Sequence, residues 1–233
     1  MTQSHDLLST KQALVRPGKG TLAADESGPT IAKRFTAIGV ESTPENRRAY
    51  RSLLLSTPGL GEFVSGVILY EETLGQCTED GESLPALAAR QGIVPGIKVD
   101  TGKGPLALAP GDEITQGLDG LSARLQACVK LGARFAKWRA VYNVSDSLPS
   151  RAAVEANAES LARYAAICQT EGVVPIVEPE VLIDGDHSQA RCAAVTQEVL
   201  LAVFRALHRH HVALEHMLLK PSMVVTGKAH VRQ

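Results

Sequence analysis

Charged side chains recur at the ends of several short apolar segments of the sequence. The most informative is Lys220, which follows the apolar pair Leu218 and Leu219 and precedes Pro221. Burial among apolar side chains disfavours the ammonium form of a lysine, and a neutral amine can attack a ketone carbon to form a Schiff base. Lys220 is therefore a candidate nucleophile. The alternative is a lysine at the end of a strand that reaches into solvent.

A second group of charged residues has the spacing that such a nucleophile would need. Lys137 and Arg139 alternate along one apolar segment, and Glu178 and Glu180 alternate along another, so each pair lies on one face of a β-strand. A cationic Lys137 near Lys220 would favour the neutral amine. Glu178 could move protons onto and off the oxygen of a carbinolamine.

Further polar residues end other predicted strands. Lys98 and Arg139 are suited to bind a phosphate or another anion. Asp25 ends the first apolar segment, and its alternative role is to cap the helix that follows. Taken singly, Lys137 also fits a surface residue and Glu178 also fits a simple strand end. Taken together, these residues predict imine chemistry on a phosphorylated carbonyl compound.

The segments that carry these residues alternate with helical patterns. Strands are expected over 21–27, 63–70, 93–100, 133–139, 173–180 and from about 217. Helices are expected over 31–38, 43–56, 82–91, 115–132, 150–172 and 188–211, with a loop rich in glycine and proline over 101–111. This alternation favours a parallel sheet with crossover helices.

The position of the polar residues favours one parallel architecture over another. They lie at the carboxyl ends of the predicted strands, where parallel α/β folds bind ligands. No Gly-x-Gly-x-x-Gly or Walker sequence follows the first strand, which disfavours a dinucleotide or ATP site. We therefore predict a (β/α) barrel rather than a doubly wound sheet.

Composition excludes several classes of function. The chain has 233 residues, 44% hydrophobic and 21% charged, which is typical of a globular protein with a sizeable core. A net charge of -1 gives no overall attraction to nucleic acid or an anionic membrane, and 4% aromatic residues leave few groups for base stacking. Residues 1–11 are polar, and no run approaches the roughly 18 apolar residues of a membrane span. A cytoplasmic location is expected.

Cysteines and histidines do not form a recognisable metal motif. Cys77, Cys128, Cys168 and Cys192 contain no Cys-x-x-Cys pair, so we predict free, buried thiols in a reducing compartment. A histidine cluster near the end of the last predicted helix raises metal binding as an alternative; its members are His208, His210, His211 and His216. No carboxylate or cysteine completes a standard motif there, so no metal is expected.

Five stretches of the sequence resemble class I fructose-bisphosphate aldolases, in order and along essentially the whole chain. They are residues 19–27, 96–100, 135–139, 175–180 and 218–221. The resemblance implies an eight-stranded (β/α)8 TIM barrel and cleavage of fructose 1,6-bisphosphate, in glycolysis, to dihydroxyacetone phosphate and glyceraldehyde 3-phosphate. It also implies a cytoplasmic homotetramer whose substrate is a phosphorylated ketose.

The resemblance also implies a role for each matching residue. Lys220 would form the Schiff base, and Glu178 would act as general acid and base during dehydration of the carbinolamine. Asp25 would take the proton from the C4 hydroxyl, while Lys137 and Glu180 would stabilise developing charge and tune the lysine. The protonated imine would accept the electron pair of the broken bond, so neither a metal nor another cofactor would be needed.

Substrate contacts are implied for a further group. Lys98 and Ser27 would lie toward the phosphate distal to the imine, and Arg139 would also contact the substrate. Thr30 would offer a hydroxyl in a loop where Gly28 and Pro29 replace a more serine-rich run.

Chain length raises an alternative to catalysis. Barrels of this type typically need about 250 residues, so we expect one barrel domain over 1–233 that is incomplete at its C-terminus, with six of eight strands. Such a fragment could be a catalytically inactive product or interaction module that keeps the motifs by descent.

Overall fold

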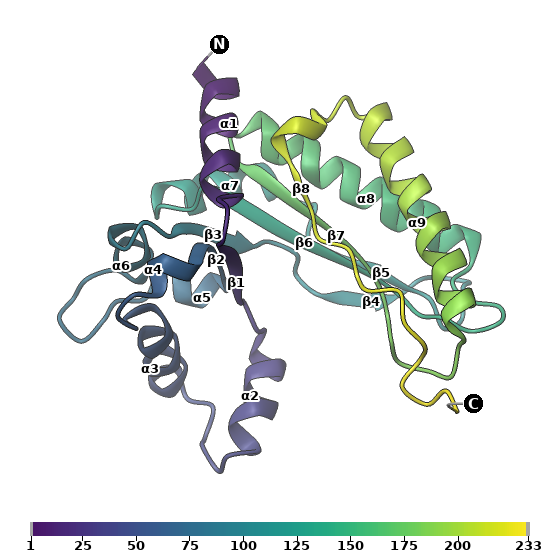
Figure 1. The fold of residues 1–233 in the computed structure, drawn as a ribbon, viewed down its shortest axis with the longest axis horizontal. Helices are drawn as coiled ribbons and strands as arrows, with labels where there is room; N and C mark the ends of the chain where they lie inside the picture. The colour runs from purple at the N-terminus through teal and green to yellow at the C-terminus, as the bar shows by residue number, and fades with distance from the viewer. Residues whose placement is uncertain (1, 232–233) are drawn as a thin grey trace. The chain divides into compact units, whose positions relative to one another are not determined.

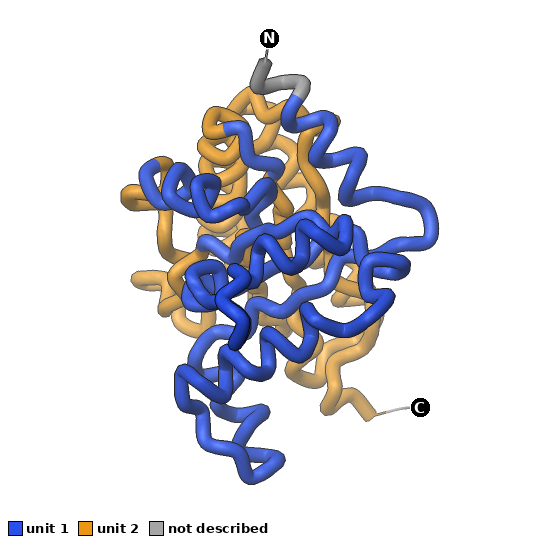
Figure 2. The backbone as a smooth tube through the Cα atoms, turned by 90° about the vertical axis from the view of Figure 1, so that its left-hand side faces the viewer, with its two compact units in different colours: residues 1–99, 123–136, 172–174 blue, residues 100–122, 137–171, 175–233 orange. Residues whose placement is uncertain are grey.

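The computed structural model describes residues 2–231, with side chains from residue 6 onward, as an α/β structure (Figure 1). Its residues fall into two compact units, coloured separately in Figure 2. Unit 1 comprises residues 1–99, 123–136 and 172–174, and unit 2 comprises residues 100–122, 137–171 and 175–233. None of the helices within 2–231 is long and apolar enough to cross a membrane.

Unit 1 is built around parallel strands with helices between them. Its elements are α1 (Thr2–Leu14), β1 (Gly20–Ala24), α2 (Gly28–Thr36), α3 (Pro44–Leu55), α4 (Leu60–Phe63), β2 (Val64–Leu69), α5 (Glu71–Leu74), α6 (Leu84–Arg90), β3 (Val94–Lys98) and most of α7 (Leu121–Lys130). Strands β1, β2 and β3 pair in that order, all parallel. The strand order β1-β2-β3 places the C-terminal ends of three strands along one edge, as the alternating sequence pattern predicted.

Close packing between β3 and Phe135 in unit 1 depends on a glycine. Gly96 on β3 lies against the ring of Phe135, and a Cβ at position 96 would overlap three ring atoms. Phe135 is fully buried, so the ring has little room to move.

Gly96→Ala is therefore expected to destabilise the protein by about 1–3 kcal/mol, the usual cost of overpacking a core. The matched control is Gly20→Ala at the start of β1, where a Cβ would meet nothing within 4 Å. Urea unfolding followed by circular dichroism measures both. Equal stability of the two variants would contradict the packing.

Unit 2 combines a short hairpin, the main length of two strands and two long helices. Its elements are β4 (Lys103–Pro105), β5 (Glu113–Thr115), β6 (Phe135–Tyr142), α8 (Arg151–Thr170), β7 (Val174–Val181), α9 (Gln189–Arg209), the 3-10 helix η1 (Leu214–His216) and β8 (Leu218–Leu219). Strands β6 and β7 begin in unit 1 and continue through unit 2. Helices α8 and α9 pack side by side (Figure 1).

Both long helices begin where the sequence predicts. The hydroxyl of Ser150 accepts a hydrogen bond from the Ala153 N–H, and that of Ser188 accepts one from the Arg191 N–H. These caps satisfy amide groups that the first turn of a helix leaves without an intrahelical partner. In unit 1, Thr43 caps α3 in the same way.

Residues 2–14, for which no element was predicted, form α1. Two predictions about the elements were wrong. The expected loop over 101–111 contains β4, which pairs antiparallel with β5. The helix expected from 115 begins at Leu121, because Thr115 ends β5 and its hydroxyl donates to the Arg139 carbonyl at 2.8 Å.

The cysteines are free, as predicted, but they differ in burial. Cys128, Cys168 and Cys192 are buried on helices, whereas Cys77 is exposed. Burial raises the pKa of the Cys128 and Cys168 thiols, which disfavours the reactive thiolate at both positions.

Candidate active site

The alternating charged residues of β6 and β7 form two ion pairs in unit 2. Lys137 and Glu178 are 5% and 4% exposed, and the Lys137 Nζ lies 3.1 Å from Glu178 Oε2. Two residues further along each strand, Arg139 Nε contacts Glu180 Oε2. The period of two in a β-strand thus places one buried and one outer ion pair on the same face.

Glu178 also contacts the candidate nucleophile. Strand β8 pairs parallel with β7, with Leu218 beside Ile176 and Leu219 beside Val177. Extension of this register places Lys220 beside Glu178. The backbone N–H of Lys220 donates to the Val177 carbonyl at 2.9 Å, and its Nζ contacts Glu178 Oε1.

A buried carboxylate is therefore shared between two lysines. One oxygen faces Lys137 and the other faces Lys220. A carboxylate within hydrogen-bond reach of an amine can take or give a proton when that amine reacts with a carbonyl. The contact between Glu178 and Lys220 is one that the predicted acid–base role requires, and the role itself stays a prediction.

The surroundings of Lys220 differ from the sequence-based expectation. Its side chain is 47% exposed, and its immediate partner is a carboxylate. The expectation of a lysine surrounded by apolar groups was wrong because β8 contributes only two residues before Pro221, so the side chain leaves the sheet at its end. Lys220 is accessible to a substrate from solvent.

Arg139 and Glu180 bind each other at the outer end of the same face. Burial lowers the pKa of Arg139, but the hydrogen bond and the negative charge of Glu180 outweigh it, so the pKa is raised. Arg139 therefore stays cationic, and it is 39% exposed at the side chain. Such a guanidinium can attract an anionic group of a substrate.

An aromatic pair that the sequence analysis did not single out packs behind the face of β6 that carries Lys137 and Arg139. Trp138 stacks on Tyr164 of α8 with ring centroids 5.5 Å apart, and the Tyr164 hydroxyl donates to the Ile176 carbonyl at 3.3 Å. Both side chains are fully buried. Trp138 lies between Lys137 and Arg139 in sequence and so points to the opposite side of β6. The packing of Trp138 on Tyr164 thus anchors β6 to α8 on the side opposite Lys137 and Arg139.

The predicted residues of unit 1 lie at the ends of its strands. Asp25 directly follows β1, and Lys98 is the last residue of β3. The N-cap of α2 is Ser27, so the alternative of Asp25 as the capping residue was wrong. Ser27 Oγ lies 3.1 Å from Thr30 Oγ1 in the first turn of α2, and these two hydroxyl groups are exposed.

One histidine of the cluster pairs with a carboxylate; the sequence analysis had considered a metal ion as its partner. His210 Nε2 lies 2.7 Å from Glu159 Oε1 on α8, and Arg209 donates to the other oxygen of the same carboxylate at 2.9 Å. Glu159 thus joins α8 to the end of α9. Between residues 2 and 231 no group of three histidine, cysteine or acidic side chains could hold a metal ion.

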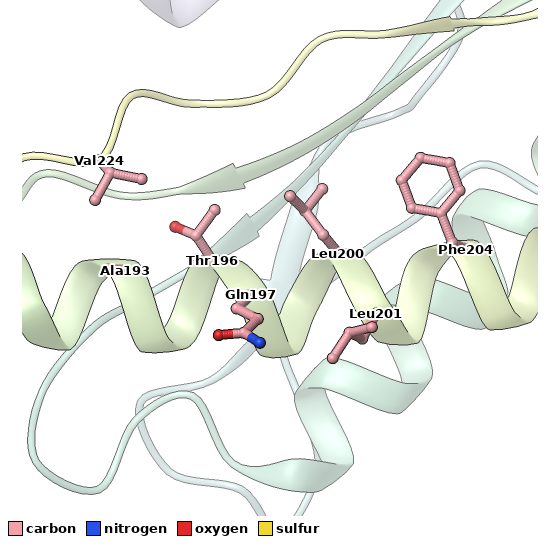
Figure 3. A pocket seen from close by; sticks show the side chains of 7 residues that line it. All are labelled: Ala193, Thr196, Gln197, Leu200, Leu201, Phe204 and Val224. Atoms are coloured by element: carbon pink, nitrogen blue, oxygen red, sulfur yellow. The ribbon is translucent and has the colours of Figure 1, made fainter.

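A pocket of about 400 Å³ on α9 lies apart from this charged face. Its lining is almost entirely apolar and includes Leu200, Leu201, Phe204 and Val224 (Figure 3). None of the predicted site residues lines it. Without a titratable side chain, this pocket has no means of proton transfer or nucleophilic attack.

Comparisons with known proteins agree with this geometry. A family model described as class-I fructose-bisphosphate aldolase matches residues 6–233. A probable fructose-bisphosphate aldolase class 1 of Xanthomonas campestris is 56% identical over 222 residues, which are 95% of this chain and 66% of that protein. The cytosolic fructose-bisphosphate aldolase 5 of Arabidopsis thaliana is 54% identical over 222 residues, which are 95% of this chain and 62% of that protein.

A solved structure extends the match to three dimensions. The fructose-bisphosphate aldolase of Plasmodium falciparum, crystallised with TRAP and a small-molecule inhibitor, superposes with a TM-score of 0.97 at 49% identity. The match covers 100% of this chain and 67% of that one, and it confirms the predicted TIM-barrel class. The chain thus spans about two thirds of the length of the relatives it matches.

Proposed function

We propose that this chain, which belongs to the class-I fructose-bisphosphate aldolase family, carries the imine-forming lysine of a lyase. The reaction is cleavage of fructose 1,6-bisphosphate to dihydroxyacetone phosphate and glyceraldehyde 3-phosphate. The observation that carries the proposal is Glu178, a buried carboxylate in contact with both Lys137 and the accessible Lys220.

The proposed steps follow from these contacts. Lys220 first gives a proton to the Glu178 carboxylate, and the neutral amine then attacks the C2 ketone, with one proton moving from nitrogen to oxygen to give the carbinolamine. Glu178 returns its proton to the carbinolamine hydroxyl, which leaves as water. The C–N bond becomes a protonated imine. When the C3–C4 bond breaks, its electron pair moves toward the imine, and the C4 hydroxyl gives up its proton to a base. Asp25 is proposed as that base.

The remaining residues have supporting roles in this proposal. Lys137 keeps positive charge beside the reacting centre, and Glu180 holds Arg139 in place. Lys98, Ser27 and Thr30 are proposed to bind the phosphate distal to the imine, and Arg139 is proposed to contact the substrate. These groups suit an anionic ligand because they offer cations and hydroxyl donors.

The proposal also covers the domain organisation, the cellular location and the assembly of the protein. We infer a single barrel domain, a cytoplasmic location and a homotetrameric assembly, on the strength of the family and of the cytosolic aldolases among the relatives. An imine mechanism needs no metal or other cofactor.

Chelation provides a test of the proposed reaction. Cleavage of fructose 1,6-bisphosphate by the purified chain is measured by coupling triose phosphate formation to NADH oxidation, with and without an excess of EDTA, which strips accessible protein metal sites. Unchanged turnover in EDTA is expected, because the imine serves as the electron sink. Loss of turnover on chelation would contradict the imine mechanism. Absence of turnover in both conditions would favour a non-catalytic role.

A further inference from the structure

The geometry points to Ser222 as a positioning residue for Lys220, an inference that rests on the function proposed above. Strand β8 is only Leu218–Leu219, so Lys220 lies just beyond its end. The side chain of a lysine at such a position can move over a wide range unless hydrogen bonds fix the backbone before and after it. Here hydrogen bonds to β7 flank Lys220 on both sides.

On the N-terminal side, Lys220 is attached to β7 by a regular backbone hydrogen bond. The Lys220 N–H donates to the Val177 carbonyl at 2.9 Å, in register with the two preceding pairs of β7 and β8. This bond fixes the start of the Lys220 residue against β7.

On the C-terminal side the regular ladder lacks one donor. Pro221 has no N–H, and neither does Pro179, which follows Glu178 on β7. In the register of β7 and β8, the N–H of residue 179 would donate to the Lys220 carbonyl, and Pro179 cannot supply that bond. The regular strand β8 ends at Leu219.

Ser222 supplies the missing contact through its side chain. The Val181 N–H, at the end of β7, donates to Ser222 Oγ at 3.0 Å. Ser222 is half-buried, so water competes only in part for this bond. The hydroxyl thereby restores attachment to β7 two residues after Lys220, and Lys220 is held between one bond at Val177 and one at Val181.

This arrangement keeps the Lys220 amine at Glu178. Glu178 lies on β7 between the two attachment points, at the register position of Lys220. Loss of the Ser222 bond would free the segment after Lys220 and let the amine move away from its proton donor. A displacement of about 1 Å can cost about 100-fold in the rate of a positioned reaction.

Ser222→Ala tests the inference through the rate of adduct formation. The purified chain is incubated with increasing dihydroxyacetone phosphate, reduced with borohydride, and the adduct on Lys220 is quantified by mass spectrometry. We expect the limiting rate to fall by about tenfold or more, with little change in the half-saturating concentration. Ser222→Thr, which keeps a hydroxyl, should restore most of the rate.

Ser145→Ala is the matched control for stability. Ser145 is also in unit 2, and its hydroxyl accepts from the Leu148 N–H at 3.1 Å. Both alanine variants should shift the urea midpoint by similar amounts, but only Ser222→Ala should slow the labelling of Lys220. Hydrogen exchange at Val181 should quicken in Ser222→Ala alone.

The outcomes separate this inference from the proposed function. A wild-type chain that labels at Lys220, together with a Ser222→Ala variant that labels equally fast, would overturn the positioning role alone. Equal slowing in the Ser145→Ala control would also overturn it, because the effect would then be one of general stability. A wild-type chain that forms no adduct would overturn both.

Discussion

Glu178→Gln is expected to slow adduct formation at Lys220 by about 100-fold or more, the usual contribution of a positioned proton donor. Glutamine has the shape of glutamate, but it cannot donate a carboxylic proton to the carbinolamine oxygen. The same change removes the carboxylate that Lys137 contacts at 3.1 Å in a buried environment. Breaking a buried pair in this way typically costs about 3–5 kcal/mol of stability. Labelling kinetics and urea unfolding measure the two effects separately.

The control for this variant is Glu155→Gln on α8. Glu155 also pairs with an arginine, but that pair is 61% and 87% exposed at its two side chains. Exposed pairs contribute little, so stability and labelling should stay near the wild-type values. A Glu178→Gln variant that behaves like this control would refute the acid–base assignment.

Lys137→Met is expected to destabilise the protein by about 3 kcal/mol, the lower end of the range for a broken buried pair. The loss should lie at that end because Glu178 keeps its contact with Lys220. Labelling of Lys220 should also slow, since a cation beside the reacting amine would be lost. Urea unfolding and labelling of the single variant measure both changes.

A double-mutant cycle with Glu178→Leu sharpens this prediction. When both charges are replaced by apolar side chains, no uncompensated charge remains between β6 and β7, so the double variant should be less destabilised than the sum of the singles. Additive losses would show that Lys137 and Glu178 do not depend on each other. Labelling of Lys220 should stay slow in the double variant, because the variant regains stability but still lacks the carboxyl group of Glu178.

Much of the parallel sheet could be predicted from the sequence, because its signals are local. Apolar runs of strand length alternate with helical patterns that begin at Thr43, Ser150 and Ser188. The period of two along β6 and β7 also predicted which charged side chains share a face, and the contact between Lys137 and Glu178 lies on that face.

Other elements gave no such signal. The strands β4 and β5 have three residues each, too few for a periodic pattern. Helix α1 is mostly polar, and its buried Leu7 and Leu14 lie two turns apart, which is a sparse pattern to detect.

The candidate site was predicted in part from chemistry and in part from resemblance. Residue types and strand ends predicted Lys220 and Glu178 as reacting groups, and the structure places the two side chains in contact. The assignment of Asp25 to the C4 hydroxyl came from the family motif, since an aspartate before a helix fits a capping role equally well by sequence alone. The positioning bond of Ser222 depends on the paired register of β7 and β8, which no local pattern encodes.

Borohydride trapping of the imine shows which lysine reacts with the substrate. The 233-residue chain is incubated with dihydroxyacetone phosphate and reduced, and the modified residue is located by mass spectrometry, with Lys220→Met as the control. We expect one reduced adduct, on Lys220, that is absent from the Lys220→Met variant. An adduct on a different lysine, or no adduct at substrate saturation, would contradict the assignment of Lys220 as the imine-forming residue of this chain.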